Sequence, residues 1–501
     1  SGNTVTVFLI DGLSGSLFES EMKAGRLPVL RSMMATGTYV KNGICSFPTM
    51  TGYGYYPFIT GKDATESGIL GLRWFDRSRQ GGNFRNYVGR TNVNMNDDIT
   101  DTIRNVFEMS QPHYTASINT FMNKGVAHNI KTGWSHTTAK YEGRGIFRWL
   151  RAVPVLGRYM APDHFEHETN AMDLALRQLA KNPRVHWVTF PSPDAANHVF
   201  GTTAMYTGLL HHIDSLIGVY ISETRRLGQQ QTRMIAVVSD HGISDVDDNL
   251  DFSKWLAAET GLLTERGKSV HILSPELDAP LSDYDGFDGF FVINGNLAGY
   301  LYMKDPLQPS HTAWRHNLPP ELLEAYPTAR GTINLPEVLS KNPKLELVIS
   351  RGKSGRISIR NGPENLAEID MDAAGRILYH PVCGNPLLYP ETVHDTFLSK
   401  SEWLDKTLDS EFPYAIVRIW QLLNKPGIGD VVLTSRKGVD LAYDYEMFVG
   451  NYKGGHGGLR REILSVPFIY SIPGGKPGVL NGMTNERMGE IIIRHLNERP
   501  E

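Results

Sequence analysis

Cysteine is scarce in this chain, and long apolar runs and a strong excess of one charge are missing. The only cysteines among the 501 residues, Cys45 and Cys383, are too few for a cysteine-ligated zinc site or a disulfide framework, and the sequence leaves open whether they pair or stay free. No apolar run is long enough to span a bilayer. A net charge of −4 carries no whole-chain signal for nucleic-acid binding, and we expect none.

The remaining composition is that of a large globular protein. Hydrophobic residues make up 41% and charged residues 21%, which allows a large core together with an inserted or second domain. The chain opens with Ser1-Gly2-Asn3, and the first apolar segment follows at once without a signal peptide, which indicates a trimmed mature chain. We find no internal repeats and no low-complexity tract.

Apolar segments alternate with helical patterns along the chain. Nearly continuous apolar runs predict buried parallel strands at Thr4–Ile10, Arg184–Phe190 and Arg233–Ser239. Helix-like patterns lie at 13–36, 170–180 and 206–227. This alternation predicts an α/β fold, a doubly wound and mostly parallel sheet with helices on both faces.

A change of composition after residue 304 predicts an insertion. The segment 290–303 still has the pattern of a core strand, but proline-rich and charged stretches follow from 305 to 414. The core pattern resumes near 415–423. We therefore predict a catalytic core at 1–304 and 415–501, interrupted by a cap at 305–414 that selects substrate.

Polar residues that can bind a metal follow the predicted strands. Asp11 ends the first strand, and Asp240 and His241 end the strand at 233–239. Asp194 and His198 follow the strand at 184–190 at i, i+4 spacing. Each has an ordinary alternative, since an Asp before Gly starts many turns and a capped turn can carry a surface histidine.

A late histidine, His456, stands among four glycines in Gly454-Gly455-His456-Gly457-Gly458, which by itself is more typical of a plain loop.

The segment Phe47-Pro48-Thr49-Met50-Thr51-Gly52 carries hydroxyl groups between a possible strand at 38–44 and a helix predicted to begin near Thr51. The N–H groups of such a helix would point toward an anion on the hydroxyl, which suits a nucleophile that attacks a phosphate or sulfate. A hydroxyl needs a base or a metal to become nucleophilic at neutral pH. The alternatives are an ordinary N-cap threonine and, as rival nucleophile, Thr49.

Taken together, these segments resemble the type I phosphodiesterase/nucleotide pyrophosphatase family of the alkaline phosphatase superfamily. That family has an Asp after its first strand, Pro-Thr-x-Thr, Asp-x-x-x-His, Ser-Asp-His-Gly and a late Gly-x-His-Gly. The corresponding segments here occur in the same order over nearly the whole chain: Asp11, Pro48-Thr49-Met50-Thr51, Asp194 to His198, Ser239 to Gly242, and Gly454 to Gly457.

The resemblance implies a zinc-dependent phosphohydrolase with two zinc ions. One ion would be held by Asp194, His198 and His456, and its role would be to activate water. The other would be held by Asp11, Asp240 and His241, and Thr51 would also reach it as the nucleophile that becomes a phospho-threonine. Secretion or a periplasmic location is the expectation from the same resemblance.

The substrate is less closely specified. Near the position where family diesterases keep a neutral Asn, this chain has Leu72 or Arg73, and a cationic Arg73 favours a more highly charged substrate. The alternative function is therefore a phosphomonoesterase, or a hydrolase or transferase of a phosphorylated headgroup, in the same superfamily. A binding module with a structural zinc site is disfavoured. Such sites usually fill all four positions with protein ligands, and a structural site would not need all six candidate ligands and the threonine that are present here.

We expect a small phosphorylated substrate, including one with a lipid headgroup. The basic and apolar segment 143–160 offers either a membrane-surface contact or, as we prefer, a helix packed on the core.

Overall fold

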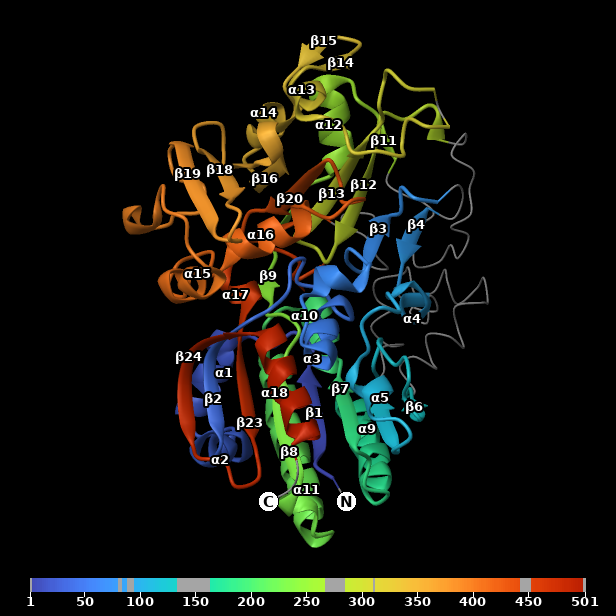
Figure 1. The fold of residues 1–501 in the computed structure, drawn as a ribbon, viewed down its shortest axis with the longest axis vertical. Helices are drawn as coiled ribbons and strands as arrows, with labels where there is room; N and C mark the ends of the chain where they lie inside the picture. The colour runs from blue at the N-terminus through green and yellow to red at the C-terminus, as the bar shows by residue number, and fades with distance from the viewer. Residues whose placement is uncertain are drawn as a thin grey trace.

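The computed structural model describes residues 2–79, 83–87, 94–132, 163–265, 284–309, 311–441 and 452–498. Within these ranges, two eight-stranded sheets form separate lower and upper parts of the molecule, and both chain ends lie at the bottom of the lower part (Figure 1). The basic and apolar segment 143–160, for which a packed helix or a membrane contact was expected, lies outside the described residues. No helix in the described part is long and apolar enough to cross a bilayer.

The lower sheet is mostly parallel, as predicted. Its central strand β1 pairs in parallel with β7 and β8, and only β23 runs against its neighbours. The order across the sheet is β24 (Gly478–Thr484), β2 (Thr38–Ile44), β23 (Ser465–Ser471), β8 (Arg233–Val238), β1 (Thr4–Ile10), β7 (Val185–Phe190), β5 (Thr115–Ile118) and β6 (His128–Ile130).

Helices cover both faces of this sheet, and β1 is therefore buried on both sides. Phe8 and Ile10 pack in one cluster with residues of α1 (Gly15–Lys23), α2 (Pro28–Thr36), α9 (His164–Leu179) and α11 (Ala204–Arg226). Val7 and Leu9 belong to another cluster with α3 (Tyr56–Thr60) and α18 (Asn485–Asn497). The predicted doubly wound α/β fold is confirmed, and the continuous apolar strand follows from burial on both faces.

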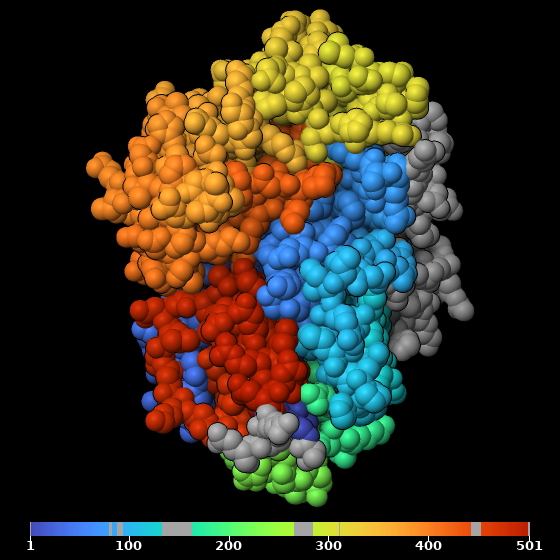
Figure 2. Space-filling model, viewed as in Figure 1, coloured from blue at the N-terminus to red at the C-terminus, as the bar shows by residue number. Residues whose placement is uncertain are grey.

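The upper sheet is largely antiparallel, and its strands lie between residues 264 and 435. Its order is β11 (Thr264–Glu265), β12 (Gly289–Asn294), β13 (Ala298–Met303), β20 (Val431–Ser435), β16 (Leu345–Arg351), β17 (Ile357–Arg360), β18 (Leu366–Met371) and β19 (Ile377–Cys383). Between the sheets, Figure 2 shows the blue segment that follows β2 wedged under the yellow and orange upper part.

Two local predictions need correction. The segment 290–303 does not join the main sheet but forms the β12–β13 hairpin of the upper sheet, together with strands from the proposed cap. An apolar run predicts that a strand is buried, but it does not predict which sheet the strand joins. The helix expected near Thr51 begins later, because Gly52 has a positive φ of 75°; a 3₁₀ turn at Tyr53–Tyr55 precedes α3. The question that the sequence left open for the cysteines is also answered: both are free, Cys45 buried and Cys383 exposed.

Candidate active site

The predicted ligands meet at the carboxyl edge of the lower sheet. Asp11 follows β1, and Asp240 and His241 follow β8, its direct neighbour. Asp194 and His198 lie on α10 (Ser192–Phe200), which begins just after β7 on the other side of β1. Parallel strands bring their carboxyl ends to one edge, so residues far apart in the sequence come together there.

The structure groups six of these residues into two clusters, each with ligand atoms within 4.8 Å of one another. In the first, His198 Nε2 lies 3.3 Å from one carboxylate oxygen of Asp194, and His456 Nε2 lies 3.6 Å from the other. In the second, His241 Nε2 lies 3.3 Å from Asp11 Oδ1 and 3.6 Å from Asp240 Oδ2.

The two clusters are adjacent, because the rings of His241 and His456 stack with centroids 3.6 Å apart.

Each histidine is oriented by a backbone carbonyl at its other nitrogen. The Nδ1 atoms of His198, His241 and His456 lie 3.0, 2.8 and 2.7 Å from the carbonyl oxygens of Gly454, Gly242 and Thr49. Because a carbonyl only accepts, Nδ1 carries the proton, and Nε2 keeps its lone pair toward the carboxylates. This is the usual arrangement of a metal-binding histidine.

The electrostatics of the site fit divalent cations. Burial, together with the charges of Asp240 and Asp194, raises the pKa of Asp11 well above its ordinary value. Burial and the charge of Asp194 do the same to the pKa of Asp240. Burial also acts to raise the pKa of Asp194, but His198 and His456 outweigh it and lower that pKa.

Two buried carboxylate oxygens in this site, Asp194 Oδ1 and Asp240 Oδ2, have no hydrogen-bond partner. Nitrogen and oxygen donors gathered around buried unsatisfied oxygens are a suitable donor set for zinc.

Thr51 lies at the second cluster. Its Oγ1 is 3.3 Å from Asp11 Oδ1 and 3.2 Å from His241 Nε2. The rival hydroxyl of Thr49 is fully buried and is held between the Gly457 N–H and the Gly458 carbonyl. Of these two hydroxyls, Thr51 is therefore the one in contact with the candidate metal ligands.

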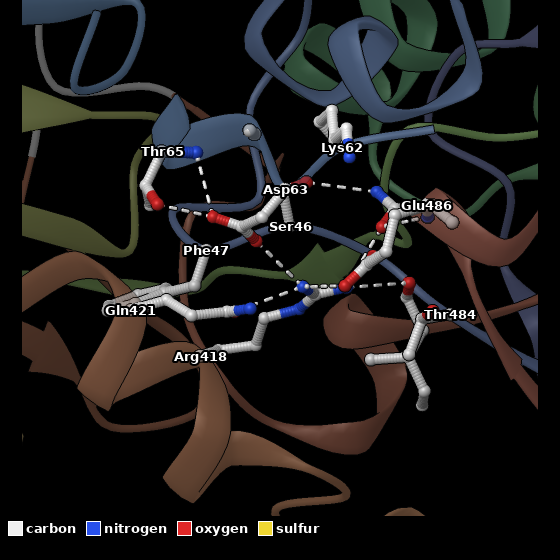
Figure 3. A network of polar contacts seen from close by, with 12 residues as sticks. Ser46, Phe47, Lys62, Asp63, Thr65, Arg418, Gln421, Thr484 and Glu486 are labelled. Atoms are coloured by element: carbon white, nitrogen blue, oxygen red, sulfur yellow. Dashed lines mark hydrogen bonds and ion pairs between the residues drawn. The ribbon is translucent and has the colours of Figure 1, made fainter. Parts of the chain in front are cut away.

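A buried arginine supports the segment that leads to Thr51. Figure 3 shows Arg418, from α16 (Ala415–Leu423), with its guanidinium directed at the carboxylates of Asp63 and Glu486, each 2.9 Å away. The same guanidinium donates to the carbonyls of Ile44 and Cys45, at 3.3 and 2.8 Å. It therefore ties the end of β2 to α16 and α18.

Sequence reasoning missed this contact, although a single arginine inside the apolar run Ala-Ile-Val-Arg-Ile-Trp was a usable signal of a buried charge.

Arg73, the predicted substrate residue, lies in β3 (Arg73–Phe75) and is 2% exposed. Its Nη1 donates to the carbonyl of Ile293 at 3.4 Å, and its backbone N–H and carbonyl both bond the side chain of Asn294. These contacts hold Arg73 against the end of β12. That Arg73 takes part in substrate selection stays a prediction.

Comparisons with known proteins agree with this architecture. The chain is 22% identical over 251 residues to human ectonucleotide pyrophosphatase/phosphodiesterase family member 1, a match that covers 47% of this chain and 23% of the relative. The mouse protein of the same name matches at 22% over 241 residues, 47% of this chain and 24% of the relative. The matched segment thus spans about a quarter of the length of these curated relatives.

Solved structures share the fold over nearly the whole chain. Human ectonucleotide pyrophosphatase/phosphodiesterase 5 superposes with a TM-score of 0.56 at 12% identity, covering 99% of this chain and 96% of the other. The murine protein, solved in complex with AMP as an inactive variant with a threonine replaced by alanine, gives 0.53 at 12% identity, covering 100% and 96%. The chain therefore shares the fold of these solved structures.

The family profile of type I phosphodiesterase/nucleotide pyrophosphatase matches residues 5–286, more than half of the chain. This match includes Thr51 and five of the six candidate ligands, which the fold gathers at one edge of the lower sheet: Asp11, Asp194, His198, Asp240 and His241. The chain belongs to the type I phosphodiesterase/nucleotide pyrophosphatase family.

Proposed function

We propose that this chain is a zinc-dependent phosphohydrolase of the phosphodiesterase/pyrophosphatase type that acts through a phospho-threonine on Thr51. The observation that carries the proposal is the position of the Thr51 hydroxyl, 3.3 Å from Asp11 and 3.2 Å from His241, beside two adjacent Asp/His clusters. Two divalent ions, when bound there, would acidify hydroxyls and neutralise charge on the phosphoryl group.

The residues of the chain have distinct tasks in this reaction. The Thr51 oxygen attacks phosphorus, a new O–P bond forms, and the bond to the leaving group breaks. Asp11 accepts a hydrogen bond from the Thr51 hydroxyl and orients its oxygen for the attack. Water then cleaves the phospho-threonine and restores Thr51. Asp194, His198 and His456 would hold an ion that would acidify that water.

Family membership and the AMP bound to the murine structural relative favour a small phosphorylated substrate, including a nucleotide. A lipid-linked phosphate remains a class to be tested. The number of ions is supported by the two separate clusters, and zinc is supported by their mixed nitrogen and oxygen donors.

The direct test is hydrolysis of a matched substrate panel by zinc-loaded protein. The panel contains a chromogenic phosphodiester, a monoester, a diphosphate-linked nucleotide and a sulfate ester. We expect the highest kcat/KM on the diester or the diphosphate linkage. Preference for the monoester would support the alternative phosphomonoesterase, and turnover of none of the four above the Thr51→Ala background would overturn the proposal.

A further inference from the structure

Thr49 lies two residues before the proposed nucleophile, and all its polar groups bond one loop. Its hydroxyl donates to the carbonyl of Gly458 at 3.0 Å and accepts from the N–H of Gly457 at 2.8 Å. Its backbone N–H lies 3.3 Å from the Gly457 carbonyl, and its own carbonyl accepts from Nδ1 of His456 at 2.7 Å. Four hydrogen bonds therefore join the nucleophile segment to the loop of the last ligand.

The other side of this loop rests on the β12–β13 turn of the upper sheet. The carbonyl of His456 accepts from the N–H groups of Asn296 and Leu297, at 3.1 and 2.9 Å. A Cβ on Gly457, where φ is +113°, would lie 2.2 Å from the Asn294 carbonyl oxygen. The loop is thus closely confined on this side by rigid backbone, and Thr49 holds it from the opposite side.

We propose that Thr49 is the positioning residue that holds His456 in place, so that the Thr49 hydroxyl sets the metal affinity of the Asp194–His198–His456 cluster. This rests on the metal centre proposed above. Removing the hydroxyl leaves a buried N–H at Gly457 and a buried carbonyl at Gly458 without their partner. The loop then relaxes at 457–458, and His456 shifts with it although its Nδ1 keeps the bond to the Thr49 carbonyl. Thr51 keeps its own contacts with Asp11 and His241.

Thr60 provides a matched control in the same stretch of chain. Its buried hydroxyl also donates to a backbone carbonyl, that of Tyr56 at 2.7 Å, and accepts from a backbone N–H, that of Lys62 at 3.2 Å. Both bonds stay within the α3 region, and neither touches the loop at 456–458. Thr49→Val and Thr60→Val therefore remove the same kinds of bond, but only the first removes them from the ligand loop.

The experiment measures zinc binding by competition with a chelator, in the wild type and in Thr49→Val, Thr49→Ser, Thr60→Val and His456→Ala. We expect Thr49→Val to weaken one of the two ions by about 10–100-fold, the usual effect of losing a group that orients a ligand, and to leave the other unchanged. Thr49→Ser and Thr60→Val should bind both ions like the wild type. Combined with His456→Ala, Thr49→Val should cause no further loss, because both changes act on the same ion.

Thermal unfolding of the metal-free variants separates this role from general stability, since Thr49→Val and Thr60→Val should lower Tm by similar amounts. If Thr49→Val does not fold, Thr49→Cys, which keeps the volume but weakens both bonds, is measured in the same way. Equal affinities in Thr49→Val and the wild type, or equal losses in Thr49→Val and Thr60→Val, would overturn this proposal alone. A wild type that binds no zinc would overturn the metal centre as well.

Discussion

At the scale of single residues, Thr51 and Thr49 differ in what their hydroxyls contact. The hydroxyl of Thr51 contacts Asp11 and His241, whereas the hydroxyl of Thr49 is hydrogen-bonded to backbone groups of the loop at 457–458. We therefore expect Thr51→Ala to abolish turnover while the zinc content and Tm stay near those of the wild type, because only the attacking oxygen is lost. Steady-state kinetics and elemental analysis check this.

Thr51→Ser, which keeps a hydroxyl, is the matched variant and should retain measurable turnover. A kcat of Thr51→Ala within about tenfold of the wild type would remove Thr51 as the nucleophile.

Arg73 supports a second prediction. A guanidinium near the substrate stabilises a dianionic phosphate more than a monoanionic diester. Losing one charge-assisted hydrogen bond costs ~1.5–3 kcal/mol, about one to two decades in rate, so Arg73→Ala should lower kcat/KM for a monoester by that factor more than for a matched diester. Arg79→Ala, at a more exposed arginine nearby, is the control. If the ratio does not change, Arg73 acts only in the packing against β12.

Glu21 gives a prediction about pH. Its carboxylate accepts from Arg26 at 2.7 Å and from His211 at 2.6 Å, and these partners lower the pKa of Glu21 from 4.5 to about 2. A carboxylate with a lowered pKa stabilises the folded state above its unfolded pKa and loses this contribution as pH falls through the folded value. The Tm difference between the wild type and Glu21→Gln should therefore shrink from pH 4.5 to pH 2.

The measurement is made in chelator, so that loss of metal at low pH does not contribute. Glu19→Gln, on the exposed face of the same helix, is the control and should show little difference from the wild type at either pH. A Tm difference for Glu21→Gln that is constant with pH would contradict the assigned ion pairs.

At the scale of elements, the buried charges around Arg418 join β2, α16 and α18. Burial raises the pKa of Asp63 although Arg418 opposes it, whereas for Glu486 the attraction to Arg418 outweighs burial and lowers the pKa. Arg418→Met would leave the buried carboxylate of Asp63, the partly buried carboxylate of Glu486 and the carbonyls of Ile44 and Cys45 without this partner. We expect a loss of about 3–5 kcal/mol in stability, together with a fall in kcat, because the segment before Thr51 is no longer held.

Thermal unfolding and kinetics measure both effects. Arg226→Met is the control, because Arg226 forms an exposed pair with Glu223, and such pairs are worth about 0–1 kcal/mol. Adding Asp63→Asn and Glu486→Gln to Arg418→Met should recover part of the lost stability. An Arg418→Met variant as stable as Arg226→Met would contradict the assignment.

At the scale of the whole molecule, the two ions would join distant parts of the chain. Their ligands come from residue 11, from 194 and 198, from 240 and 241, and from 456. Because a ligand that binds only the folded state stabilises it by mass action, chelation should lower Tm, corresponding to ~4 kcal/mol for each ion present at a thousand times its Kd. Differential scanning calorimetry with and without chelator checks this prediction.

Zinc should restore the Tm of the chelated protein, whereas magnesium and calcium should not, since they prefer all-oxygen sites. A Tm that is the same in chelator and in zinc would contradict a metal centre in the folded protein.

The sequence by itself determined the central strands of the main sheet and predicted the residues of the candidate site. The strand Thr4–Ile10 was predictable to the residue because burial on both faces demands an uninterrupted apolar run. Five of the six candidate ligands were predictable because they follow such strands, and parallel strands end at one edge; His456, in its glycine-rich loop, was predicted only from the family resemblance. Local sequence carries both signals, since each depends only on neighbouring residues and on a general rule of the fold.

The tertiary structure alone decided which segments meet. The β12–β13 hairpin has the same apolar pattern as a strand of the lower sheet, so its place in the upper sheet depends on long-range pairing with β20. Two sets of hydrogen bonds join residues that are about 370 to 410 positions apart in the sequence. They are the bonds of Thr49 to the loop of His456 and those of Arg418 to Ile44 and Cys45. Such contacts depend on how the two sheets pack together, and no local pattern encodes that packing.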